Sequence, residues 1–176
     1  MTLVAFFRGV NVRGGETFRP AALAKQLADL DVVNVGTAGT LVVRKASSPM
    51  VLRAAIEERL SIEPDLIVCR GDEILDLIKS DPFRSAPDET EDIRRFVTVM
   101  AKAPHTVPRL PLEKLAGNKW EVRVIKITGQ FAFSLWRRVG RAAVYPNAVV
   151  EKHFAIPSTT RSWDTISAIG DILKEA

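Results

Sequence analysis

The order of apolar runs over the first 70 residues is the feature that most constrains the fold. Four short runs rich in apolar and β-branched residues predict strands; they span residues 3–7, 32–35, 41–43 and 66–69. After Pro20 and after Ser48-Pro49, leucine and isoleucine recur every three or four residues, which predicts two helices. This βαββαβ order is that of a ferredoxin-like unit. We therefore expect an α+β protein with a ferredoxin-like first half.

The second half shows a different pattern and predicts a second α/β subdomain. Strands are expected at 96–100, 122–127 and 131–136, a short helix at 112–115, and longer helices at 147–154 and 163–173, whereas a further helix at 72–79 closes the first half. The Thr128-Gly129 turn predicts an antiparallel hairpin between the last two strands. The β-α-β-β-α order, followed by a helix, leads to the hypothesis that this half is a structural echo of the first.

A polar stretch containing Pro87 separates the two halves. We expect a ferredoxin-like subdomain over 1–83, a linker over 84–92, and a second α/β subdomain over 93–176 that packs on the first and ends in C-terminal helices. With 47% hydrophobic and 26% charged residues, the composition is that of an ordinary globular protein and excludes a disordered chain or a fibre.

Cysteine usage and charge indicate the surroundings of the protein. The single cysteine, Cys69, cannot form an internal disulfide, and no apolar run approaches the roughly 18 residues of a membrane span, so we expect a cytoplasmic protein with no membrane partner. The net charge is +4, and residues 89–176 carry 14 Lys and Arg against 9 Asp and Glu. A basic second half favours encounter with anions such as nucleotides or nucleic acid.

Several segments along the chain resemble one family of proteins. They are Arg8–Gly15 (RGVNVRGG), Asp81-Pro82-Phe83, Pro146-Asn147, Val150-Glu151-Lys152, Ile156-Pro157, Thr159-Thr160-Arg161, Trp163 and Thr165. In this order, across essentially the full chain, they closely resemble the "domain of unknown function 1697" family of bacterial proteins. The resemblance implies an α/β protein with a ferredoxin-like first half, and it carries no activity, cofactor or catalytic residue.

One segment departs from the pattern of that family. Relatives often carry Gln-Ser-Gly-Asn where this chain reads Thr37-Ala38-Gly39-Thr40. Ala38 and Thr40 lack the hydroxyl and the amide of those relatives, so a ligand contact made there would be altered here.

The glycine-rich loop after the first strand is one candidate binding site. It lacks the lysine and the hydroxyl residue of a nucleoside triphosphate loop, but its backbone N–H groups could hold an anion. The predicted ligand-binding residues are Arg8, Asn11, Arg13, Gly14 and Gly15. The alternative is a structural turn after a strand.

A second candidate site precedes the C-terminal helix. Hydroxyls, a guanidinium and amides at a helix entrance suit a phosphate or carboxylate. The predicted ligand-binding residues are Thr159, Thr160, Arg161, Trp163 and, just upstream, Lys152. The structural alternative is capping of the helix by Ser162 or Thr160, with Trp163 as a packing anchor. We expect this segment and the glycine-rich loop to form one electropositive cleft.

Other chemistry-bearing residues have weaker patterns. Glu151 is the one candidate for a catalytic acid or base, its alternative being a solvated ion pair with Lys152. A basic and aromatic patch (Arg137, Arg138 and Arg141 with Trp136 and Tyr145) is either a site for single-stranded nucleic acid or a charged hairpin end.

The cysteine and the two histidines do not define a site by their spacing. Cys69 before Arg70 is either a reactive thiol or a core residue. His105 and His153 lack partners at metal-ligand spacing, so neither a metal nor a cofactor is expected.

Three functions follow as hypotheses. The first is a binding module for a phosphate-bearing anion such as a nucleotide or nucleic acid. The second is an enzyme acting on a small phosphorylated or carboxylated substrate, with Glu151 as acid or base. The third is an interaction module without a ligand, and neither enzymatic activity nor oligomeric state follows from the sequence.

Overall fold

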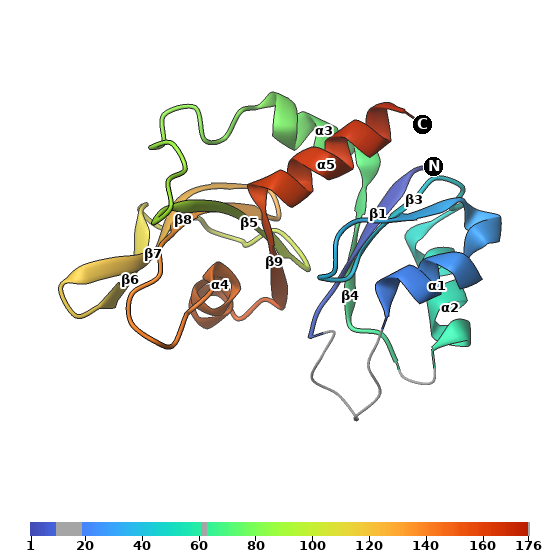
Figure 1. Ribbon diagram of the computed structural model, residues 1–176, viewed down its shortest axis with the longest axis horizontal. Coiled ribbons are helices and arrows are strands. Elements are labelled where there is room, and N and C mark those ends of the chain that lie inside the picture. The colour runs from blue at the N-terminus through green and yellow to red at the C-terminus, as the bar shows by residue number, and fades with distance from the viewer. Residues whose placement is uncertain (10–18, 61–62, 176) are drawn as a thin grey trace. The chain divides into compact units, whose positions relative to one another are not determined.

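The structure, a computed structural model, describes residues 1–9, 19–60 and 63–175. The protein is an α+β protein with two antiparallel sheets, of four and five strands, and the described residues include five α-helices (Figure 1). The chain divides into two compact units: Met1–Lys79 together with the chain from Ser167 onward, and Ser80–Ile166. No helix in the described ranges has both the length and the apolar character needed to cross a membrane.

The first unit has the element order that the sequence predicts. Its elements are β1 (Leu3–Phe7), α1 (Pro20–Gln26), a short 3-10 helix (Ala28–Leu30), β2 (Val32–Asn34), β3 (Thr40–Val43), α2 (Pro49–Arg59), β4 (Leu66–Arg70) and α3 (Gly71–Lys79). The strand order is β2-β3-β1-β4, with every neighbouring pair antiparallel. Each βαβ connection therefore leaves one strand between the two that it joins.

Local signals begin helix α2 where the sequence places its start. The Ser48 hydroxyl accepts a hydrogen bond of 3.2 Å from the backbone N–H of Val51, and Pro49 occupies the first helical position. The first turn of a helix leaves backbone N–H groups without a partner. The Ser48 hydroxyl accepts from one of them, and proline at the first position has no N–H to leave unpaired. The predicted start of α2 is confirmed.

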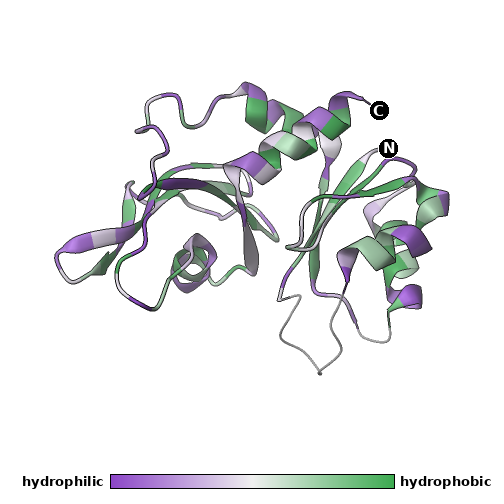
Figure 2. Cartoon of the chain, viewed as in Figure 1, coloured by the Kyte–Doolittle hydropathy of each residue, from purple (hydrophilic) through white to green (hydrophobic). Residues whose placement is uncertain are grey.

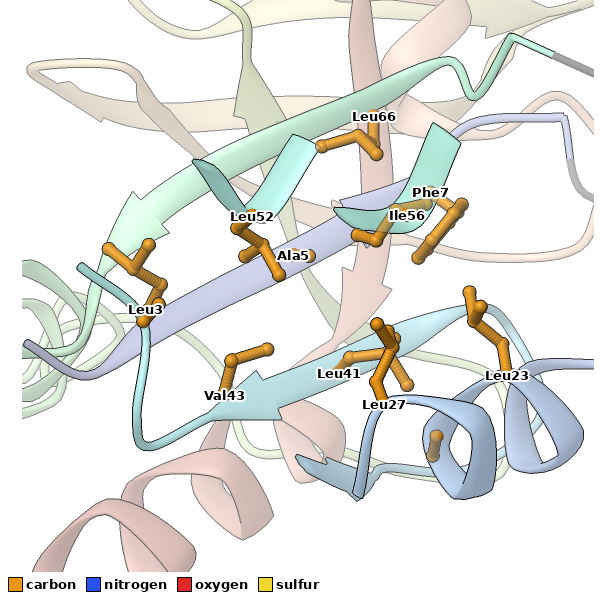
Figure 3. Packing of buried hydrophobic residues seen from close by; sticks show 12 residues of the cluster. Leu3, Ala5, Phe7, Leu23, Leu27, Leu41, Val43, Leu52, Ile56 and Leu66 are labelled. Carbon is orange, nitrogen blue, oxygen red and sulfur yellow. The ribbon is translucent and has the colours of Figure 1, made fainter. Parts of the chain in front are cut away.

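Strand β1 is buried on both of its faces. Leu3, Ala5 and Phe7 pack against residues of α1 and α2 (Figure 3). Val4 and Phe6, which point to the opposite face, are also fully buried. A central strand buried on both faces carries a continuous apolar run rather than an alternating one, as the colouring of this sheet in Figure 2 shows.

The second unit is built around the five-stranded sheet. Its elements are β5 (Arg94–Met100), β6 (Leu112–Ala116), β7 (Lys119–Thr128), β8 (Phe131–Trp136), α4 (Pro146–Phe154) and β9 (Ser158–Ser162), and α5 (Trp163–Lys174) begins in it. The strand order is β6-β7-β8-β5-β9. Helix α4 covers one face, where Val150 packs with Met100, Val122, Val124 and Ala132. The predicted hairpin of β7 and β8 is confirmed.

Two predictions for the second half are wrong. Residues 112–115 form strand β6 rather than a helix, because a single helical turn is unstable alone whereas a hairpin through Gly117 pairs this segment with β7. Strand β9 was not predicted, so the order from β5 onward is β-β-β-β-α-β-α and not an echo of the first unit.

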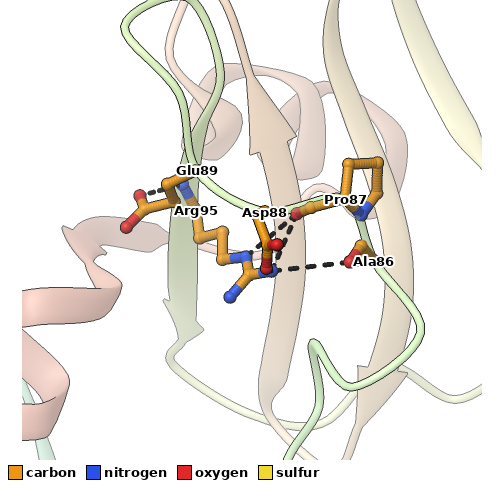
Figure 4. Close-up of polar contacts among 5 residues, drawn as sticks. All are labelled: Ala86, Pro87, Asp88, Glu89 and Arg95. Atoms are coloured by element: carbon orange, nitrogen blue, oxygen red, sulfur yellow. Dashed lines mark hydrogen bonds and ion pairs between the residues drawn. The ribbon is translucent and has the colours of Figure 1, made fainter.

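Residues 84–92, expected as a linker, are fastened to β5 by Arg95. Its Nη2 donates to the carbonyl oxygen of Pro87 at 2.8 Å, and its backbone N–H donates to Glu89 Oε1 at 2.7 Å (Figure 4). The guanidinium also lies 5.5 Å from the centre of the Phe83 ring. This segment is therefore part of the second unit.

Candidate functional site

Arg8 is the described cation of the first candidate site. Its Nη1 lies 2.6 Å from Asp65 Oδ2, and its backbone N–H donates to the carbonyl oxygen of Asp65 at 2.8 Å. An anion bound by Arg8 would therefore compete with a carboxylate already in place. Asn11, Arg13, Gly14 and Gly15 lie outside the described residues. Their binding role stays a prediction, as does the meeting of this loop with residues 159–163.

The threonines of the second candidate site are engaged within the second unit. Thr160 Oγ1 lies 2.9 Å from Thr98 Oγ1 on β5 and accepts a hydrogen bond of 3.0 Å from the backbone N–H of Asn147. Thr159 Oγ1 accepts one of 2.8 Å from Arg161 Nη1. These bonds explain why two threonines in a row suit β9: one fastens the strand to β5 and α4, and the other holds Arg161.

Arg161 is a buried cation. It is 5% exposed, and its Nη1 also donates to the carbonyl oxygen of Thr160 at 2.9 Å. Burial lowers the pKa of Arg161 to about 10, because the charged form loses its hydration. A phosphate that paired with this guanidinium would have to reach a group that the fold encloses.

The structural alternative for Ser162 is confirmed. Its hydroxyl accepts a hydrogen bond of 3.2 Å from the backbone N–H of Thr165 and so caps α5. Trp163 packs edge-on against Phe83, with ring centres 5.2 Å apart, and Phe83 packs in the same way against Phe133 at 5.8 Å. This is the packing expected of an anchor, and a ligand contact by Trp163 stays a prediction.

Glu151 and Lys152 lie at the end of α4. The Glu151 side chain is half-buried, and its Oε1 accepts a hydrogen bond of 2.8 Å from the backbone N–H of Ser158. Lys152 is exposed in the last turn of the helix. Glu151 thus serves the connection between α4 and β9, and its role as acid or base stays a hypothesis.

A basic pocket that the sequence did not reveal lies in the second unit. Its volume is about 580 Å³, and residues 80–82 and 84–87 line it together with residues of β7 and β8. Three cations border it, namely Arg84, Arg123 and Lys126, against the single carboxylate of Asp81. Hydroxyl groups come from Ser80 and Ser85. Positive charge and hydroxyl donors around a hollow of this size suit an anionic ligand.

The cations of the pocket differ in their partners. Arg123 Nε lies 2.6 Å from Glu113 Oε1, and its guanidinium lies 4.7 Å from the centre of the Trp120 ring. Arg84 and Lys126 form no ion pair with any other residue in the described part of the chain. Two of the three charges are therefore available to a ligand.

A β-bulge explains why the sequence did not reveal this pocket. Strict alternation along β7 would place Arg123 and Lys126 on opposite faces of the sheet. The register shifts between Val124 and Lys126, so Arg123 faces Leu135 across the ladder and Lys126 faces Phe133. Because Leu135 and Phe133 share a face, the bulge brings both cations to it.

The remaining candidates from the sequence are Cys69 and the histidines. Cys69 is 2% exposed within β4, in agreement with the core alternative. Within the described ranges, no three His, Cys, Asp or Glu side chains gather as metal ligands would. His153 packs edge-on against Phe154, with ring centres 4.6 Å apart.

The fold and the pocket define an α+β protein with a basic hollow beside its second sheet. The family model described as "Protein of unknown function (DUF1697)" matches residues 1–131, and the chain belongs to this family. The matched range ends before residues 146–165, which carried part of the resemblance. Comparison with curated proteins gives no match.

One solved structure supports the fold. The conserved bacterial protein SP0830 from Streptococcus pneumoniae is similar over 98% of each chain, with a TM-score of 0.55 and 14% sequence identity. At this identity the similarity concerns the fold alone.

Proposed function

We propose that this DUF1697 protein is a binding module for a phosphate-bearing anion, and that the basic pocket of the second unit is its site. The proposal rests on the three cations that border the pocket with one carboxylate, two of them unpaired among the described residues. Arginine suits phosphate because its planar fork can donate two parallel hydrogen bonds, and lysine adds a compact charge.

The pocket combines one fixed cation with two adjustable ones. Glu113 and the Trp120 ring hold Arg123 in place. Arg84 lies on an exposed segment, whereas Lys126 is half-buried. A half-buried cation without a counterion interacts strongly with an entering anion, because the local dielectric constant is below that of water. Lys126 is therefore the side chain whose loss should weaken binding most.

Two further parts of the proposal concern the fold and the surroundings. The strand order β2-β3-β1-β4 supports a ferredoxin-like arrangement of the first unit. The single cysteine, buried in β4, suits a reducing compartment such as the cytoplasm.

The enzyme hypothesis has less support than the binding hypothesis, because the Glu151 carboxylate already accepts a hydrogen bond from the backbone of β9.

Isothermal titration calorimetry with pyrophosphate and with nucleotides at low salt tests this function. The informative variants are Lys126→Met and Arg84→Met, and Lys102→Met is a matched control because Lys102 is exposed and does not line the pocket. We expect the wild type and the control to bind, affinity to fall as salt rises, and both pocket variants to lose affinity. Absence of binding, or a Lys126→Met variant that binds like the wild type, would overturn the proposal.

A further inference from the structure

An aromatic stack lies on the face of the second sheet opposite the basic pocket. The rings of Trp136 and Tyr145 are parallel within 2°, with centres 5.6 Å apart. Phe96 meets both edge-on, at 5.8 Å and 6.2 Å. Trp136 packs with the core beneath α4, whereas its neighbour Leu135 lines the pocket. Successive residues of a strand point to opposite faces, so the stack and the pocket are separate features.

Next to the stack, both backbone polar groups of Val144 form hydrogen bonds with side chains. Trp136 Nε1 donates to the carbonyl oxygen of Val144 at 2.9 Å. The backbone N–H of Val144 donates to Glu121 Oε1 at 3.0 Å, and Glu121 is 2% exposed. These two bonds hold the backbone of Val144, which precedes Tyr145. Because the Tyr145 ring also stacks on Trp136, it loses little conformational entropy when a ligand stacks on it.

The ring of Tyr145 remains open to solvent. Tyr145 is 49% exposed although Trp136 covers one face of its ring and Phe96 meets it edge-on. Among the described aromatic contacts, these two rings meet one face and the edge of Tyr145, and the opposite face of the ring has no aromatic partner. An exposed aromatic face supported by further rings is the surface on which nucleobases stack, whatever their sequence.

Arginines lie beside this ring in the sequence. Residues 137–144 include three Arg and no Asp or Glu, and the Glu121 carboxylate that accepts from Val144 is buried. Arg137 is used internally, since its Nε donates to the carbonyl oxygen of Trp120 at 2.6 Å and its guanidinium lies 4.2 Å from the centre of that ring. Arg138 and Arg141, in the segment between Trp136 and Tyr145, are exposed and form no ion pair in the described part of the chain.

We propose that this aromatic and basic surface binds single-stranded nucleic acid. A base would stack on the outer face of Tyr145, and neighbouring phosphates would contact Arg138 and Arg141. The proposal is independent of the anion pocket, because the two sites share no side chain. Stacking provides affinity without sequence preference, and the arginines make it salt-dependent.

Fluorescence anisotropy with a labelled oligothymidylate of about 12 nucleotides tests the site. We expect binding that weakens with salt and falls by roughly tenfold in Tyr145→Ala, whereas Tyr145→Phe keeps the ring and the affinity. Arg138→Gln with Arg141→Gln should reduce the slope of log affinity against log salt by about 1.4, since each phosphate contact contributes about 0.7. Lys102→Gln with Arg109→Gln, which removes two exposed cations elsewhere, is the matched control.

Several outcomes would overturn the proposal. They are absence of binding at low salt, Tyr145→Ala binding like the wild type, or the control pair weakening binding as much as the Arg138 and Arg141 pair. An abasic oligomer of equal length that bound as tightly would show attraction by charge alone, and displacement by thymidine monophosphate at equal nucleotide concentration would assign the site to free nucleotides. Near-ultraviolet circular dichroism verifies that each variant is folded. Lys126→Met should leave oligonucleotide binding unchanged, which separates this proposal from that of the pocket.

Discussion

The carboxylate of Glu151, at the end of α4, accepts a hydrogen bond of 2.8 Å from the backbone N–H of Ser158, the first residue of β9. Between them the chain reverses through Ala155, whose φ is 53°. Ser158 is 2% exposed, so its N–H has little access to water. The residue that sequence analysis selects as a candidate acid or base therefore helps to bring the last strand of the sheet into place.

The structural role of Glu151 can be tested by measuring the free energy of unfolding of variants at this position. Glu151→Ala leaves the buried N–H of Ser158 without this acceptor, and we expect a loss of about 1–3 kcal/mol in the free energy of unfolding. Glu151→Gln keeps an acceptor oxygen and should lose clearly less. Urea denaturation of the two variants and the wild type measures the difference. Equal stability of all three would contradict the role described here.

Replacement of Arg161 by lysine should make stability depend on pH. Burial already lowers the pKa of Arg161 to about 10, and a lysine in its place, with an ordinary pKa of about 10.4, should fall well below that value in the folded state. The unfolded chain then binds more protons than the folded one at alkaline pH, so stability rises as pH increases towards the unfolded pKa. We expect Arg161→Lys to lose stability near pH 7 and to recover part of it near pH 9.5.

Melting temperatures of Arg161→Lys and the wild type, compared at about pH 7 and about pH 9.5, measure this effect. The difference between the two proteins should shrink at the higher pH. Arg161→Met, which carries no titratable group at this position, is the control and should differ from the wild type by the same amount at both values. A lysine variant that behaves like the methionine variant would contradict the prediction.

Helices α3 and α5 approach each other closely at Gly170. A methyl group on Gly170 would overlap Cδ1 of Ile78, the end of a flexible side chain that can move aside. In an open helix, glycine to alanine gains about 1 kcal/mol, and here the displacement of the Ile78 methyl group should offset part of that gain. Ile78→Val removes the overlapping atom, so Gly170→Ala should gain more stability in that background. A double-mutant cycle by urea denaturation reports the coupling, and strictly additive effects would argue against the contact.

The cap of α2 allows a simpler test. Ser48→Ala removes the acceptor for the N–H of Val51, and we expect a loss of about 1 kcal/mol. Ser48→Asp retains an acceptor and also places negative charge at the positive end of the helix, so its stability should equal or exceed that of the wild type. Thermal unfolding of the two variants provides the comparison. An alanine variant as stable as the wild type would show that water replaces the cap.

Local signals explain the parts of the fold that were predictable. The apolar run of β1 and the alternation in β8 each specify a strand without reference to distant residues. The serine-proline pair at 48–49 likewise specifies where α2 begins. For the candidate sites, sequence identified the aromatic and basic residues around Tyr145, because they are close together in the chain.

Long-range pairing decided the rest. Strand β9 contains no apolar run, and its conformation depends on the ladder with β5, which joins residues about 60 positions apart such as Thr98 and Thr160. The pocket depends on a bulge that changes which face of the sheet Lys126 occupies relative to Arg123. By itself, the sequence determined the elements whose stabilising groups lie within a few residues of one another. Only the tertiary structure decided where strands pair and which side chains meet, because those depend on contacts between segments that the chain separates.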